Sequence, residues 1–223
     1  MALVQVYPLS QGNDSSGAPL AASSSTIKIL VVDGPTLSSY GSPDLISYLQ
    51  GKSNTQVTTE TLAPGGSLTN DPSQYDVVFV LELDGNLTTA DKSKFQQLIN
   101  RGGRIIGLGE HSGFPNQNAA ISDLSAFLGG SITITSTNDT GASYNNGGGV
   151  INLANNDVLD GVTEWKTAAS ATLEVDDSNT TVLIVDDVNR ILVADQRLSN
   201  GRLTVWADID AIVGNDFTAS NKI

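Results

Sequence analysis

The stretch Arg101-Gly-Gly-Arg-Ile-Ile-Gly-Leu-Gly-Glu-His-Ser-Gly-Phe114 decides the fold of this chain. Its first glycines are typical of a helix end, and the run Arg104–Gly109 predicts a short buried strand. An abrupt loop follows, which carries Glu110, His111 and Ser112. In an α/β sheet, ligands and catalytic groups usually lie just beyond the carboxyl ends of the strands. The loop is therefore the first candidate for a functional site, and it holds the only histidine of the chain.

Strand and helix patterns alternate around this stretch. The β-branched runs Ile27–Asp33 and Tyr75–Leu83 predict buried parallel strands, and Gln56–Leu62 fits an edge strand. Three amphipathic helices are predicted: one from Ser42 to Gly51, one capped by Thr88 or Thr89 and closed by Gly102, and one over about Asn118–Leu128. This order predicts an α/β fold, a mostly parallel sheet flanked by helices.

From Ser131 onward the pattern changes to short strands with tight turns. The predicted strands are Ile132–Thr135, Val150–Leu153, Ala171–Val175, Thr181–Asp186, Ile191–Asp195 and Leu203–Asp208. Hairpin turns are predicted at Asp186–Arg190 and Leu198–Arg202. We therefore expect a C-terminal antiparallel β extension within a single domain over residues 26–223.

Composition argues against several classes of function. The chain has 11 Lys and Arg against 24 Asp and Glu, a net charge of −13, and no Lys or Arg between Arg104 and Lys166. This argues against nucleic-acid binding, which needs basic residues to replace counterions. The absence of cysteine excludes disulfides, thiolate metal sites and a cysteine nucleophile. The sequence has no apolar run of about 18 residues, so no membrane-spanning helix is predicted. Scarce lysine and abundant Ser, Thr, Asn and Gly favour an extracellular or surface location, with a cytoplasmic one left open.

Residues 1–25 are predicted to form a separate N-terminal arm and linker. Leu3, Val4, Val6 and Leu9 make a short apolar, strand-like patch, and a Ser- and Gly-rich linker composition follows it. An apolar strand on a linker can add to a sheet edge of its own or a neighbouring subunit, or it can be a frayed terminus. Because these apolar side chains are unfavourable in water, we expect the segment to be an interaction arm. We therefore expect a homo-oligomer.

Four pieces of sequence carry a family resemblance: Ile27–Gly34, Tyr75–Leu83, Gly102–Glu110 with Phe114 and Asn118, and Gly201–Asp210. Together they resemble the class I glutamine amidotransferase-like (flavodoxin-like) fold, in particular its non-catalytic relatives in bacterial surface and gliding-type proteins. Such domains usually continue beyond the late Asp-x-Asp into a further helix. The resemblance thus implies room for the arm of this or a neighbouring subunit to complete the fold.

Catalytic members of that fold class carry their nucleophile at the turn after the strand that matches Arg104–Gly109. Here Gly109 and Glu110 stand at that point, and the chain has no cysteine. Ser112 lacks the Gly-x-Ser-x-Gly pattern of a nucleophile elbow, and three sequence neighbours cannot converge as a triad. One histidine cannot build a typical zinc site. The chain is predicted not to be an enzyme, and a hydrolase using Glu110, His111 and an aspartate is the least favoured alternative.

A rim of polar residues is the candidate ligand site. Asp33 and Asp208 end predicted strands, so they can converge with Glu110, His111 and Asp210. Carboxylates can bind calcium, but no acidic group matches the Asp-x-Asp-x-Asp-Gly loop, so no metal ligand or cofactor is assigned. In the alternative, structural interpretation, the Glu110 carboxylate accepts hydrogen bonds from the N–H groups that open the third helix.

The sequence thus predicts a non-enzymatic structural protein of a cell or virion surface. Its subunits would associate partly through the N-terminal arm, as an oligomer or filament. The alternative is a surface module that binds carbohydrate or a metal ion at the rim.

Overall fold

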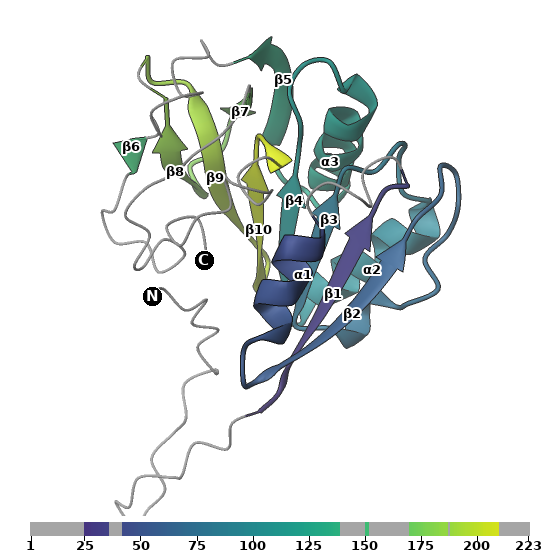
Figure 1. Cartoon of the computed structure of the whole chain (residues 1–223). Helices are drawn as coiled ribbons and strands as arrows, with labels where there is room; N and C mark the ends of the chain where they lie inside the picture. The colour runs from purple at the N-terminus through teal and green to yellow at the C-terminus, as the bar shows by residue number, and fades with distance from the viewer. Residues whose placement is uncertain (1–24, 36–41, 139–149, 152–169, 187, 210–223) are drawn as a thin grey trace, which may run out of the picture.

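The computed structural model describes residues 25–35, 42–138, 150–151, 170–186 and 188–209. Its elements in chain order are β1 (Ile27–Asp33), α1 (Ser42–Gln50), β2 (Thr55–Thr61), a 3-10 turn (Pro72–Gln74), β3 (Val77–Leu81), α2 (Thr89–Asn100), β4 (Arg104–Leu108), α3 (Pro115–Phe127), β5 (Ile132–Asn138), β6 (Val150–Ile151), β7 (Ala171–Val175), β8 (Thr180–Val185), β9 (Ile191–Leu198) and β10 (Gly201–Trp206). These strands form one sheet in the order β2-β1-β3-β4-β10-β9-β7-β5, and β8 pairs with both β9 and β6 (Figure 1).

One half of the sheet, which we call the parallel half, consists of β2, β1, β3, β4 and β10. Its central strands are apolar on both faces because helices cover both, and all five residues of β3 are buried. The prediction for this strand was too long, since β3 ends at Leu81 and not at Leu83. Glu82 adopts φ 43°, a left-handed conformation that ends the strand.

The other half, the antiparallel half, consists of β5, β7, β8 and β9, together with the two-residue β6. β10 joins the halves, because it is parallel to β4 and antiparallel to β9. Both predicted hairpin turns are confirmed. Leu198 pairs with Gly201 around Ser199, whose φ is 51°, and Asn189, at φ 64°, lies in the turn between β8 and β9.

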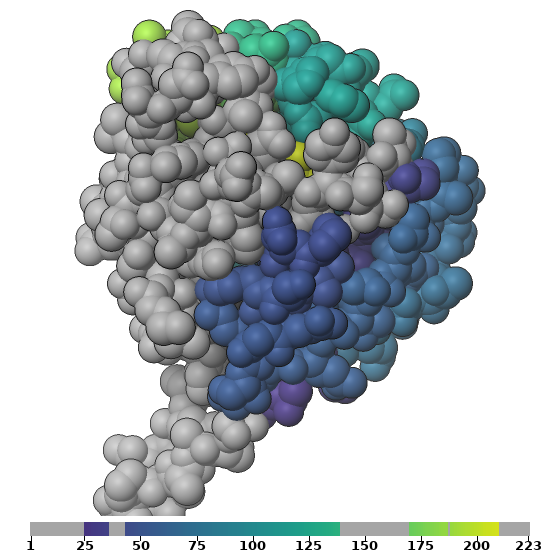
Figure 2. Space-filling view, in the orientation of Figure 1, coloured from purple at the N-terminus to yellow at the C-terminus, as the bar shows by residue number. Residues whose placement is uncertain are grey.

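Helices cover both faces of the parallel half. α1 lies on one face, in front of the sheet in Figures 1 and 2, and packs Leu45 and Leu49 onto the sheet core that includes Val31 and Phe79. α2 and α3 contribute to the second core, on the opposite face. Thr88 caps α2 as predicted, accepting a hydrogen bond from the Asp91 N–H at 3.2 Å.

α3 begins at Pro115, three residues before the predicted start at Asn118, and proline suits a first helical turn. None of the described helices is long and apolar enough to cross a membrane. The predicted fold class is confirmed. The arm patch at residues 3–9, the end of the predicted strand Val150–Leu153 and the rim residue Asp210 lie outside the described residues.

Candidate functional site

Four carboxylates lie along the carboxyl edge of the parallel half. Asp33 ends β1, and Glu82 directly follows β3. Glu110 and Asp208 each lie two residues beyond the end of a strand, β4 and β10 respectively. These four strands are neighbours, and no more than 6% of any of the four residues is exposed. The predicted rim residues Asp33, Glu110 and Asp208 therefore share one edge of the sheet.

Sequence reasoning missed Glu82, the fourth member of this edge. It was counted inside the strand because Leu-Glu-Leu continues an apolar run. Its left-handed backbone turns the chain tightly over the end of β1, where a Cβ added to Gly34 would lie 2.0 Å from the Glu82 carbonyl oxygen. A single carboxylate in a wholly buried run was the available signal, because a buried charge has to be paired or hydrogen-bonded.

Asn118 fixes the backbone at the end of β4. Its side-chain oxygen accepts the Glu110 N–H at 2.8 Å, and its side-chain nitrogen donates to the Glu110 carbonyl at 2.7 Å. The Glu110 carboxylate accepts the N–H of His111 at 2.7 Å. The structural interpretation of Glu110 thus needs correction: its carboxylate bonds to its own loop, and Asn118 makes the link to α3. Gly109 leaves room for this clamp, since a Cβ there would lie 2.8 Å from the Asn118 oxygen.

His111 and Ser112 also serve the local structure of the loop. His111 Nδ1 accepts the Gly113 N–H at 3.0 Å, and the imidazole meets the Phe114 ring edge-on at 4.8 Å between centroids. His111 Nε2 lies 3.8 Å from a Glu110 oxygen. The Ser112 N–H donates to the Asn138 side chain at 2.7 Å, which ties the loop to the end of β5. One imidazole nitrogen is therefore engaged with backbone and is not available as a general base.

A second polar network lies beside this loop. Asp186, only 2% exposed, accepts the N–H of Arg190 at 2.8 Å and its side-chain Nε at 2.6 Å. Arg190 Nη1 donates to the Asn138 carbonyl at 2.7 Å. The turn between β8 and β9 is thus linked to the end of β5, and through Asn138 to Ser112. The sequence predicts Asp186 at the end of a strand and the start of a hairpin turn, and it does not predict this bond to Arg190.

The described part of the chain shows no metal centre. No three of its histidine, aspartate and glutamate side chains are arranged so that they could hold a metal ion. Asp210, the remaining predicted rim residue, lies outside this part of the chain.

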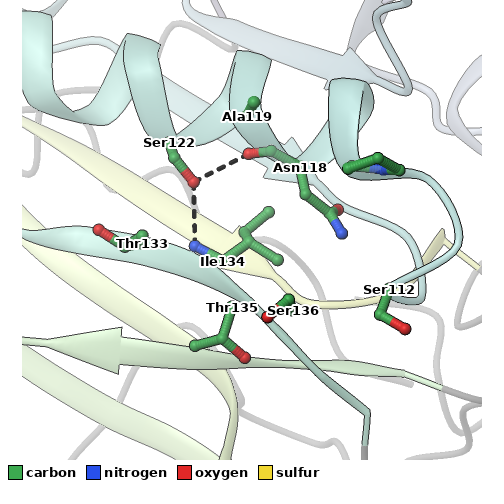
Figure 3. Close-up of a pocket in the computed structure, with 9 residues that line it drawn as sticks. Ser112, Asn118, Ala119, Ser122, Thr133, Ile134, Thr135 and Ser136 are labelled. Carbon is green, nitrogen blue, oxygen red and sulfur yellow. Dashed lines mark hydrogen bonds between the residues drawn. The ribbon is translucent and has the colours of Figure 1, made fainter.

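A neutral groove separates α3 from β5 (Figure 3). Its volume is about 380 Å³, and it is lined by Ser112, Pro115, Asn118, Ala119, Ser122, Thr133, Ile134, Thr135 and Ser136. None of these side chains is charged. Ser122 bridges the two walls, because its hydroxyl donates to the Asn118 carbonyl at 2.8 Å and accepts the Ile134 N–H at 3.0 Å. A larger cleft of about 700 Å³ over β5 and β7 differs from it, since Glu174, Asp176 and Arg190 line that cleft.

No protein-family model and no curated protein matches this sequence. Solved structures do match the fold. The cytoplasmic protein STM1381 from Salmonella typhimurium LT2 superposes with a TM-score of 0.61 at 13% identity, over 83% of this chain and 89% of that chain. A putative ThuA-like protein from Parabacteroides merdae gives 0.51 at 16% identity, over 82% and 79% of the two chains.

A beta-galactosidase from Bacillus circulans sp. alkalophilus also matches, with a TM-score of 0.53 at 14% identity. The match covers 86% of this chain but only 30% of that enzyme. Identities this low show the fold alone. ThuA-like proteins have the glutamine amidotransferase-like fold, and this chain has an amidotransferase-like α/β fold.

Proposed function

We propose that this chain is a non-enzymatic structural protein that self-assembles, partly through its N-terminal arm. The observation that carries the proposal is the state of the loop after β4. This is the point at which catalytic members of the fold class carry their nucleophile. Here the polar groups of the loop are engaged in holding the loop itself together.

A nucleophilic mechanism needs a nucleophile and a base within hydrogen-bond reach of each other, with the base oriented by a third group. Instead, the Glu110 carboxylate accepts a backbone N–H, His111 Nδ1 accepts another, and Asn118 holds the Glu110 backbone. The chain contains no cysteine. These features support a place among the non-catalytic surface relatives that the sequence resembles.

Assembly is supported by the arm and by the edge of the sheet. Residues 1–12 contain no charged side chain in a protein whose net charge is −13, and Leu3, Val4, Val6 and Leu9 are apolar. Such a segment is stabilised by burial against a partner. In the described part of the sheet, β5 is a terminal strand, and edge strands can pair with strands of other chains. The product would be an oligomer or filament on a cell or virion surface.

The test compares the wild type with a chain that lacks residues 1–25 and with full-length Val4→Asp. The point variant keeps the chain length and places a charge in the arm. Sedimentation velocity over a concentration series and electron micrographs report the assembly. We expect concentration-dependent oligomers of the wild type and monomers of both variants. A wild type that stays monomeric throughout, or variants that assemble normally, would contradict the proposal.

A second candidate function is ligand binding at the carboxylate edge. The observation that favours it is the placement of Asp33, Glu82, Glu110 and Asp208 at the ends of four neighbouring strands. Carboxylates there can accept hydrogen bonds from the hydroxyls of a carbohydrate. A calcium ion would need oxygen ligands in addition to these four, because no three of the described carboxylates are arranged to hold a metal ion.

A glycan array and calorimetry with calcium test this candidate on the wild type, Glu110→Gln and Glu174→Gln. Glu174 is exposed and lies on β7, away from this edge, so its variant is the control. A ligand of the carboxylate edge should lose affinity in Glu110→Gln alone. Equal binding by both variants, or no binding by the wild type, would exclude the candidate.

A further inference from the structure

The groove between α3 and β5 is suited to a neutral, extended segment. Pro115 and Ala119 line its helix side, Ile134 lines its strand side, and the remaining lining groups are hydroxyls and an amide (Figure 3). Covering a charged surface would require desolvation of the charges, whereas this groove carries none. In a protein with a net charge of −13, it is a place where an uncharged partner can be buried at little cost.

The strand wall of the groove is also an edge of the sheet. β5 pairs with β7 in regular register only over Ile132, Thr133 and Ile134, and the register then shifts before Asn138. The Ile134 N–H points to Ser122 of α3 and not to β7. The groove side of β5 is thus closed by α3 at Ile134, and an added strand can pair only with the part of this edge beyond that residue.

The opposite end of the sheet, at β2, is charged and is covered by a loop. There β2 carries Glu60, whose carboxylate accepts four hydrogen bonds, from the backbone and side chains of Thr69 and Asn70. A charged group and a loop of the same chain therefore pack at that strand. Of β2 and β5, the strands that end the main path of the described sheet, β5 is the better match for an uncharged arm.

We propose that this groove is the docking site for the N-terminal arm of a second copy of the chain. This inference rests on the proposed function and names the surface that the arm contacts. In an extended chain, Ala2, Val4 and Val6 share one face. These small and β-branched side chains suit a groove walled by Ala119 and Ile134.

The length of the arm fits this contact. Pro8 cannot donate to a strand ladder, so it limits pairing to the residues before it. Residues 10–25 then provide a linker that reaches about 50 Å when extended, enough to bridge to a neighbouring subunit.

Cysteine cross-linking tests the contact, because the natural chain has no cysteine and any disulfide must come from introduced residues. Full-length Val4→Cys is mixed with full-length Ala119→Cys under mild oxidation. The control mixture pairs Val4→Cys with Ala126→Cys, since Ala126 is also an exposed alanine of α3 but does not line the groove. We expect a disulfide-linked heterodimer from the first mixture, at least ten times more abundant than from the control.

A second measurement uses full-length Ala119→Trp, which fills the groove, with Ala126→Trp as its control. Sedimentation velocity should show that Ala119→Trp dissociates as Val4→Asp does, whereas Ala126→Trp assembles like the wild type. If Val4→Asp dissociates while Ala119→Trp assembles and no heterodimer forms, the arm docks elsewhere. The docking site is then wrong and the proposed function stands. A third sample is the full-length chain that carries both Val4→Cys and Ala119→Cys. If it forms an intramolecular disulfide while the mixture of single variants forms no heterodimer, the arm lies in its own groove and the inference is overturned. A monomeric wild type would remove the proposed function and this inference together.

Discussion

The carboxyl edge of the parallel half and the outer strand of the antiparallel half carry polar residues of different kinds. At the carboxyl ends of the parallel half, the polar residues are charged and buried, as Asp33, Glu82, Glu110 and Asp208 are. On the outer strand of the antiparallel half they are neutral: β5 reads Ile-Thr-Ile-Thr-Ser-Thr-Asn, and its last three residues are exposed. The carboxyl edge keeps its charged groups buried, and β5 presents its hydroxyl groups to the groove.

This difference predicts a rigid carboxyl edge and a groove that can bind a partner. A buried charge is tolerated only where hydrogen bonds or ion pairs hold it, so the strand ends of the parallel half have to be well fixed. A neutral, hydroxyl-bearing surface loses little when water leaves it, so a partner can cover it. We therefore expect mutations in the parallel half to change stability and mutations along the groove to change assembly.

The largest effect on stability is expected from Gly34→Ala. The added Cβ would lie 2.0 Å from the Glu82 carbonyl oxygen, a backbone atom, so the ends of β1 and β3 must move apart. We expect the free energy of unfolding to fall by about 3 kcal/mol. Chemical denaturation measures it, with Gly85→Ala as the control because a Cβ at Gly85 has no atom within 4 Å. Equal stability of the two variants would show that the strand ends are not tightly fixed.

The next effect is expected from Asn118→Ala, which leaves the Glu110 N–H and carbonyl without their partner. Loss of two buried hydrogen bonds should lower the free energy of unfolding by about 2 kcal/mol. Asn116→Ala is the matched control, since Asn116 is exposed on the same helix. If both variants unfold at the same denaturant concentration, the clamp does not stabilise the loop.

Sequence reasoning succeeded where burial leaves a pattern along the chain. Strands covered on both faces are continuous apolar runs, so β1 and β4 were predicted within one residue of their observed ends. It missed Glu82 because a left-handed turn leaves no mark on hydrophobic periodicity. Asn118 was expected to start a helix, and its clamp on Glu110 depends on a tertiary contact. The groove also depends on a tertiary contact, since α3 and β5 meet only in the folded chain. The sequence pattern therefore does not predict it.

The pH dependence of stability compares the buried Asp91 with the half-buried Asp177. Burial raises the pKa of Asp91, but hydrogen bonds from Thr88, Lys94 and Leu68 lower it, and the net pKa lies below its ordinary 3.8. The hydrogen bond from the backbone of Asn179 likewise lowers the pKa of Asp177. A lowered pKa contributes stability that is present above the unfolded-state pKa and is lost as pH falls through the folded-state pKa.

Asp91→Asn should therefore flatten the acid side of the stability profile below about pH 4, and it should reduce stability at pH 7 by about 1.5 kcal/mol. Denaturation between pH 2 and 7 measures both. Asp177→Asn should flatten the profile less, because water screens a half-buried carboxylate more than a buried one. An equal change in the two variants would mean that the burial of Asp91 does not strengthen the dependence of stability on pH.

The smallest effect is expected from Ser122→Ala, on the helix side of the groove. Ser122 and Ser93 each donate to the carbonyl four residues earlier in a helix, but only Ser122 also accepts a strand N–H. Ser93→Ala is thus a control that removes the helical bond alone. We expect Ser122→Ala to cost about 0.5 to 1 kcal/mol more than Ser93→Ala.

Hydrogen exchange of the Ile134 amide should become faster in Ser122→Ala and stay unchanged in Ser93→Ala, because the bond from Ser122 closes the edge of β5 at that residue. Assembly should persist in Ser122→Ala, since the walls of the groove remain and an added strand can accept the released N–H. Unchanged exchange at Ile134 would mean that the edge of β5 is protected by other contacts. The edge of β5 would then be as closed as the carboxyl edge of the parallel half.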